Sequence, residues 1–153
     1  LMKAHGTVLV PTLSVFDIYY DTARDRPDLL APGTAAKELA NDRLPRQNLP
    51  RAVRSGVRIA YGTDLGEGDH TLEFQLLTEH GMSPAQALKA ATSEAAELLG
   101  LGDRLGRIAP GYVADLVALP GDPLTGIAAA RHASFVMQGG RIVRRDGQPT
   151  AIR

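Results

Sequence analysis

Two short apolar runs constrain the fold of this chain more than any other feature of the sequence. They are Val8–Leu13 and Val57–Gly62, and both have the length of a strand. Such a run suits a strand buried on both faces, as in a parallel sheet. Between them, good helix formers predict helices over 35–44 and 46–55, and Gly56 is placed to end the second one. The order helix, glycine, strand predicts a parallel α/β unit.

The next segment, 63–101, is predicted to be helical. Leu72, Leu76 and Leu77 give one apolar face, and Gly81 follows as a stop. Ser83 begins a Ser-Pro-Ala-Gln sequence, which is typical of a capping box with proline at the first helical position. Thr92-Ser93-Glu94 predicts the restart of a short helix that ends at Gly100, with Ala95, Leu98 and Leu99 facing inward.

The last segment, 102–153, has a pattern of turns and short strands in place of helices, and it predicts a small β-sheet packed beside the α/β part. Strands are expected over 114–119, 134–137 and 141–143. Gly139-Gly140 lies between the last two, and glycine tolerates the positive φ that a two-residue hairpin turn requires.

Composition limits the class of protein. The chain has 153 residues, whereas a complete (β/α)₈ barrel needs about 250. It has no cysteine, which excludes disulfide scaffolds, thiolate metal sites and cysteine nucleophiles. Basic and acidic residues balance at 17 each, which argues against a nucleic-acid partner. No apolar stretch is long enough for a membrane span, and we expect a cytoplasmic protein.

Asp64 is the sharpest candidate for chemistry. Gly62-Thr63-Asp64 places a carboxylate just past the carboxyl end of a predicted buried strand, where sites assemble in parallel α/β sheets. Taken alone, the tripeptide is more typical of a turn or of a helix cap than of a functional site.

Ordered motifs along nearly the whole chain favour a functional role of Asp64 over a turn or a helix cap. They are Val10–Leu13, Gly56–Asp64, Glu73-Phe74, Gly81–Thr92, Ala95–Leu101, Gly106–Val117, Gly121–Leu124 and Phe135–Val143. Together they resemble the amidohydrolase superfamily, in its imidazolonepropionase-like and prolidase-like branch. That family has a (β/α)₈ barrel and a small β-sandwich. The resemblance implies that this α/β chain is the C-terminal portion of the fold. Residues 1–101 would be the last two βα units with C-terminal helices, and 102–153 part of the sandwich.

The resemblance also implies a site. Asp64 matches the aspartate after the eighth barrel strand, which binds a divalent metal, zinc by expectation with one or two ions, and acts as general base. His70 would contact substrate, although a surface or helix-start histidine is the alternative. The family's His-x-His is missing, since the histidines are His5, His70, His80 and His132, and no lysine matches the carboxylated position. One carboxylate cannot hold catalytic zinc, so we expect this chain alone to retain no metal and to be inactive.

Other candidates have simpler explanations. Asp69 is expected to cap a helix, and Asp115 to serve a turn or strand edge. Thr12 and Tyr19 follow the first strand and either line a pocket mouth or pack. The other three histidines are expected to be structural or at the surface.

Three interpretations of function follow. The first is part of a metal-dependent amidohydrolase that cleaves amide or peptide C–N bonds in small molecules. The second is a non-catalytic module that survives as a homo-oligomer or by complementing an N-terminal chain, because exposed strand edges invite pairing. The third keeps the superfamily and changes the substrate, since deacetylase and dihydroorotase branches share the Gly-x-Ile-x-Pro-Gly-x-x-Ala-Asp pattern.

Overall fold

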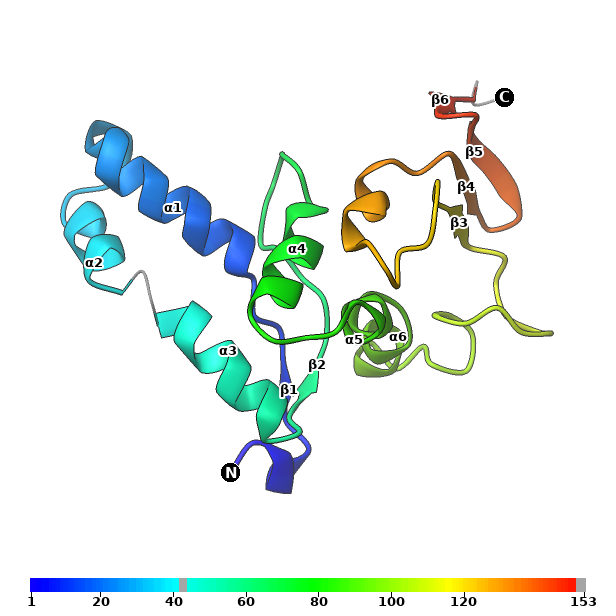
Figure 1. The fold of residues 1–153 in the computed structure, drawn as a ribbon, viewed down its shortest axis with the longest axis horizontal. Helices are drawn as coiled ribbons and strands as arrows, with labels where there is room; N and C mark the ends of the chain where they lie inside the picture. Colours follow the sequence, from blue (N-terminus) through cyan, green and yellow to red (C-terminus); the bar gives the residue numbers. More distant parts are fainter. Residues whose placement is uncertain (42–43, 151–153) are drawn as a thin grey trace.

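A parallel strand pair lies at the centre of the molecule. The computed structural model describes residues 1–41 and 44–150 and shows a mixed α/β fold (Figure 1). After a short 3₁₀ turn η1 (Lys3–His5), β1 (Val8–Leu9) pairs with β2 (Arg58–Ile59), with Val8 opposite Arg58. The backbone N–H of Ala60 extends the pairing by donating to the Leu9 carbonyl at 3.0 Å. The predicted parallel α/β unit is therefore confirmed, but both strands are shorter than the predicted runs 8–13 and 57–62, and Leu13 begins a helix.

Helices fill the connection between the two strands. They are α1 (Leu13–Asp25), the 3₁₀ turn η2 (Pro27–Leu29), α2 (Thr34–Asn41) and α3 (Leu44–Arg54). Both predicted helices are present, but Leu44 begins α3 and does not end α2. Pro45 falls in the first turn of α3, where its missing N–H removes no helical hydrogen bond.

Further helical elements follow, and those within residues 84–98 run without a break. The elements are α4 (Leu72–Glu79), α5 (Pro84–Lys89), the π-helical turn η3 (Ala90–Glu94) and α6 (Ala95–Leu98). The predicted capping box is confirmed: the Gln86 N–H donates to Ser83 Oγ at 3.2 Å, and the Ser83 N–H donates to Gln86 Oε1 at 2.7 Å.

The predicted restart at Thr92 is wrong. The chain widens into one π-helical turn and stays helical, and the Ala90 carbonyl in that turn accepts the N–H of Tyr61 at 3.0 Å. The helix thereby supplies a partner to the backbone just beyond β2. The expected inward orientation of Leu98 and Leu99 is also wrong, since they are 46% and 71% exposed.

The core lies around the strand pair and the helices that flank it. Leu13, Leu49 and Leu77 are almost fully buried there. The buried cluster is completed by Ile59, Leu76, Met82, Ala87 and Ala90. All of its members come from residues 13–90, so the first part of the chain carries its own core.

The C-terminal part is a four-stranded antiparallel sheet. Its strands are β3 (Leu116–Ala118), β4 (Phe135–Gln138), β5 (Arg141–Arg145) and β6 (Gln148–Pro149), in that spatial order, with a 3₁₀ turn η4 (Ile127–Arg131) before β4. The predicted hairpin is confirmed: Gly139 and Gly140, with φ of 56° and 80°, connect β4 to β5.

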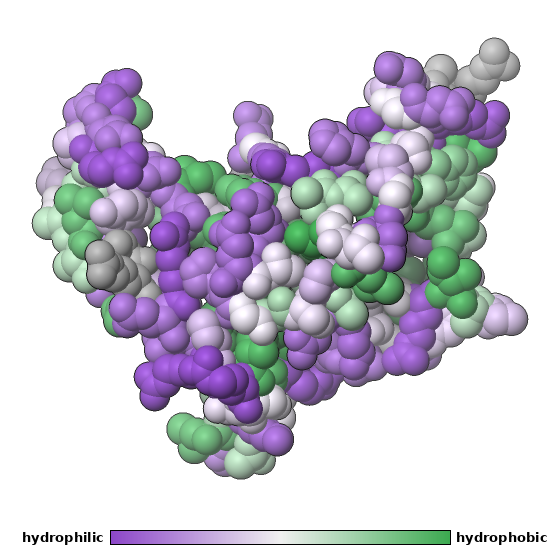
Figure 2. All heavy atoms as spheres, in the orientation of Figure 1, coloured by the Kyte–Doolittle hydropathy of each residue, from purple (hydrophilic) through white to green (hydrophobic). Residues whose placement is uncertain are grey.

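An apolar cavity of about 770 Å³ separates this sheet from the helices. Leu88 and Leu99 line it from the helical side, and Leu116 and Val136 from the sheet. Figure 2 shows hydrophobic side chains on the surface over the C-terminal sheet, at the right of the view. Within the described ranges, no helix has the length and apolar character to cross a membrane.

Candidate functional site

Asp64 lies where the sequence predicted it, past the carboxyl end of β2. Its side chain is exposed, and its backbone has φ of 55°. A non-glycine residue in this left-handed region is uncommon, and aspartate is one of the residues that tolerates it. The conformation turns the chain sharply as it leaves the strand.

The corresponding residue after β1 has the same unusual backbone. Thr12 has φ of 48°, which is a strained conformation for a β-branched residue. The two strand ends also approach closely, because a Cβ added to Gly62 would lie 2.5 Å from Val10 Cγ1. The absence of a side chain at Gly62 therefore permits the close approach of the segments that follow β1 and β2.

The loop that follows Asp64 folds back on the end of β2. The Thr63 hydroxyl and His70 Nδ1 lie 2.8 Å apart, and the Tyr61 hydroxyl donates to the His70 carbonyl. The ring of Tyr61 packs against that of Phe74 in a tilted arrangement, with centroids 4.4 Å apart. Burial, followed by the charge of Glu73, raises the pKa of Tyr61 and keeps its hydroxyl a donor. His70 is thus held on the same loop as Asp64.

Asp69 anchors the far side of this loop. It accepts the N–H of Thr71 at 2.9 Å in the turn before α4, whereas the N-cap of α4 is Thr71, so the expected cap position of Asp69 is wrong. It also accepts a 3.0 Å hydrogen bond from Arg131 Nε in η4, which ties the loop to the C-terminal part. Hydrogen bonds from the Thr71 hydroxyl and from Arg131 lower the pKa of Asp69 to about 2.

Glu73 is the buried polar residue that sequence reasoning missed. Its side chain is fully buried, and its carboxylate accepts the N–H groups of Leu13 at 2.9 Å and Ser14 at 2.7 Å. Burial raises the pKa of Glu73, and the hydrogen bonds from Ser14 and Leu13 oppose that shift. The sequence signal that could have identified Glu73 as buried was its position on the same helical face as Leu76 and Leu77.

The remaining candidates have local roles. Tyr19 is 44% exposed on α1. His80 Nδ1 lies 2.8 Å from the Leu76 carbonyl at the end of α4, as expected of a structural histidine. Asp115 accepts the N–H of Gly139 at 2.6 Å, which fits its expected role at a turn. His5 and His132 are exposed, as expected.

The described residues do not form a metal site by themselves. In residues 1–41 and 44–150, no group of three or more histidine, aspartate or glutamate side chains is arranged to hold an ion. Asp64 provides one carboxylate, whereas a catalytic zinc ordinarily takes three protein ligands. This donor set does not fit a complete metal centre.

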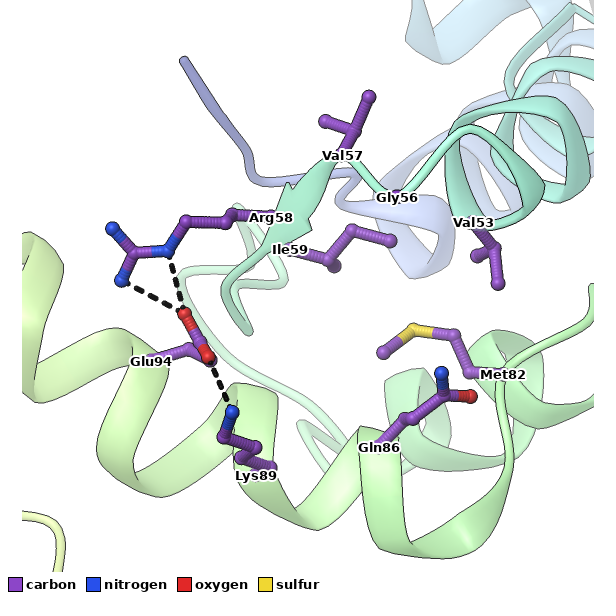
Figure 3. Close-up of a pocket in the computed structure, with 9 residues that line it drawn as sticks. All are labelled: Val53, Gly56, Val57, Arg58, Ile59, Met82, Gln86, Lys89 and Glu94. Carbon is purple, nitrogen blue, oxygen red and sulfur yellow. Dashed lines mark hydrogen bonds and ion pairs between the residues drawn. The ribbon is translucent and has the colours of Figure 1, made fainter. Parts of the chain in front are cut away.

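A second cavity, of about 230 Å³, lies at the opposite end of β2 (Figure 3). Its lining combines Ile59 and Met82 with a charged cluster in which Glu94 pairs with Arg58 at 2.8 Å and with Lys89 at 2.9 Å. Neither this cavity nor the apolar one is lined by Asp64 or His70. Two cations share one carboxylate here, and these ion pairs join the start of β2 to the helices.

Parallel strands joined through helices define an α/β protein, and folds of this class place their sites at the carboxyl ends of the strands. Comparison with known proteins identifies the group more narrowly. Residues 1–143 match the amidohydrolase family, and the chain belongs to that family.

Individual relatives agree with this assignment. Ochratoxinase from Aspergillus niger is 35% identical, over 96% of this chain and 31% of its own length. Imidazolonepropionase from Geobacillus kaustophilus is 33% identical, over 78% of this chain and 30% of its own. A crystal structure of a Xaa-Pro dipeptidase superposes with a TM-score of 0.88 at 30% identity, covering 94% of this chain and 36% of that one. The chain therefore spans about a third of the length of these relatives, and the likeness to imidazolonepropionases and prolidases is confirmed.

Proposed function

We propose that this chain supplies the strand-end carboxylate Asp64 to an amidohydrolase that cleaves a C–N bond in a small amide or peptide. The position of Asp64 carries the proposal, since the carboxyl end of a parallel strand is where such folds place reacting groups. Membership of the amidohydrolase family and the likeness to a dipeptidase and an ochratoxinase support the reaction class.

Each site residue has a stated task in this proposal. Asp64 takes a proton from the attacking water and passes it to the leaving nitrogen, the work of a general base and then a general acid. His70 contacts substrate, which agrees with its exposure and with the hydrogen bond that fixes its ring against Thr63. In the whole protein Asp64 would also be one ligand of a divalent ion, zinc by preference, which would lower the pKa of bound water.

The architecture is part of the same proposal. Strands β1 and β2 would be the last two strands of a (β/α)₈ barrel within residues 1–101, and residues 102–153 would belong to a small β-sandwich. The parallel pairing of β1 with β2 and the antiparallel order β3-β4-β5-β6 support this assignment.

Asp64→Asn, made in the whole protein that carries this sequence, tests the proposal. We expect kcat/KM for amide hydrolysis to fall by about 10²–10⁴-fold, because the amide that replaces the carboxylate cannot accept the proton. Asp103→Asn is the matched control at an exposed aspartate in the connection after α6. Rates equal to the unsubstituted protein in the Asp64 variant would overturn the assignment.

A further inference from the structure

The helix α1 has an unusual N-terminus. Its N-cap residue, Thr12, is left-handed and makes no capping hydrogen bond with its own side chain. The first N–H groups of a helix have no partner within the helix and must be satisfied from outside. Here the Glu73 carboxylate accepts two of them, from Leu13 and Ser14, although it lies 60 residues further along the chain.

The burial of the residues that make this contact shows that it is part of the protein interior. Leu13, Ser14 and Glu73 are all fully buried. Without those two N–H donors, the carboxylate would be a buried charge with no compensation, which is strongly unfavourable. Two charge-assisted hydrogen bonds and the positive end of the α1 dipole supply that compensation. The contact therefore fixes the start of α1 against α4.

The same cluster reaches the strand end that carries Asp64. Ser14, whose backbone N–H binds the Glu73 carboxylate, also donates its hydroxyl to the Thr63 carbonyl at 3.4 Å. That carbonyl shares a peptide plane with the N–H of Asp64, because the peptide unit is rigid. Restraining the carbonyl thus restrains the plane from which the left-handed turn at Asp64 begins.

We propose that Glu73 is a positioning residue, which holds the ends of β1 and β2 in register through Leu13, Ser14 and the Thr63 carbonyl and thereby sets the direction of Asp64. The catalytic consequence rests on the function proposed above for Asp64. The positioning itself is a property of the fold and is measured separately.

Backbone NMR of this chain provides the test. In Glu73→Gln, we expect amide hydrogen exchange at Leu13 and Ser14 to rise at least tenfold, and the Thr63 carbonyl ¹³C and Asp64 amide resonances to move. The side-chain amide keeps the shape of the carboxylate but presents an NH₂ group to one of the two N–H donors. Glu73→Asp keeps the charge and should restore part of the protection. Glu79→Gln, at the exposed end of the same helix, is the matched control and should leave these signals unchanged.

Ser14→Ala separates positioning from simple capping. It removes the hydroxyl and leaves both backbone N–H donors in place. We expect the Thr63 and Asp64 resonances to move while the exchange rate of Leu13 stays within twofold. If neither Ser14→Ala nor Glu73→Gln moves these two resonances, Glu73 caps the helix only and the proposal is wrong. If Glu73→Gln does not fold, the Ser14→Ala result decides.

Activity gives an independent readout. In the whole protein, Glu73→Gln should lower kcat at least tenfold with KM within twofold, because a displaced base affects the chemical step more than binding. A change in KM alone would contradict positioning. Unchanged activity in Asp64→Asn, together with the expected NMR shifts, would remove the catalytic role of Asp64 and leave the positioning intact.

Discussion

At the residue scale, one ionised side chain holds the loop between Asp64 and α4. Asp69 receives hydrogen bonds from Thr71 and Arg131, which lower its pKa to about 2. A carboxyl whose folded pKa is depressed stabilises the fold above its unfolded pKa, near 3.9, and that stabilisation is lost as the pH falls toward the folded value. The loop should therefore loosen between about pH 4 and pH 2.

Asp69→Asn measures this effect. We expect the variant to have a lower melting temperature than the unsubstituted chain at pH 6, and the difference to shrink toward zero near pH 2, because the asparagine carries no charge to lose. Thermal unfolding followed by circular dichroism across this range is the measurement. Glu67→Gln, at an exposed position in the same loop, is the control. A difference that stays constant with pH would show that the ion pair with Arg131 does not act.

The site residues illustrate what a sequence can indicate at this scale. The place of Asp64 followed from the strand before it, since strands and the residues after them are encoded locally. The role of Glu73 did not follow, because its partners are backbone groups that precede it by about 60 residues and carry no side-chain signal. The left-handed backbone of Thr12 was equally hidden, because β-branched residues are poor predictors of that conformation.

At the scale of elements, Gly106 packs closely against the backbone of the π-helical turn η3. A Cβ at Gly106 would lie 2.8 Å from the Thr92 carbonyl oxygen and 2.9 Å from Ser93 Cα, and the φ of Gly106 is 85°. Backbone atoms cannot move aside as a flexible side chain can. The connection after α6 therefore packs directly on the π-helical turn.

Gly106→Ala should consequently destabilise the chain by about 2 kcal/mol, from overpacking and from the strained φ together. Gly111→Ala is a matched control, because φ is 86° there and a Cβ would meet nothing within 4 Å. It carries the backbone strain without the clash. Chemical denaturation of both variants gives the comparison, and equal losses would show that the close packing contributes nothing.

Elements with strong local signals were predicted, and those that depend on tertiary contacts were not. The capping box at Ser83 and the Gly139-Gly140 hairpin are both present, because each is specified by neighbouring residues. The continuous passage through Thr92 was missed, because its stability comes from Tyr61 and from the approach of Gly106.

At the scale of the molecule, stability is unevenly distributed. The buried cluster lies within residues 13–90, whereas no residue of β3, β4, β5 or β6 in the described part of the chain is fully buried. Regions with few buried apolar contacts open more easily than the core. We expect native-state hydrogen exchange of β4 and β5 to be at least tenfold faster than that of α4. Uniform exchange across the two parts would contradict this view.

The oligomeric expectation from the sequence stays a prediction at this scale. Within the described residues, β1 and β2 pair with each other and with no further strand, so each leaves an edge open. Open edges and the apolar cavity beside the sheet favour association. Size-exclusion chromatography with light scattering should show a species larger than 16.3 kDa. A stable, well-folded monomer would contradict the expectation.

The distant cap on α1 also affects how the chain is made. The first turn of α1 is completed by a residue that the ribosome adds 60 positions later. At about 5–20 residues per second, that interval is about 3–12 s. During synthesis, the first N–H groups of α1 therefore remain hydrated until α4 has emerged from the exit tunnel. Only then can the contact that fixes the two strand ends form.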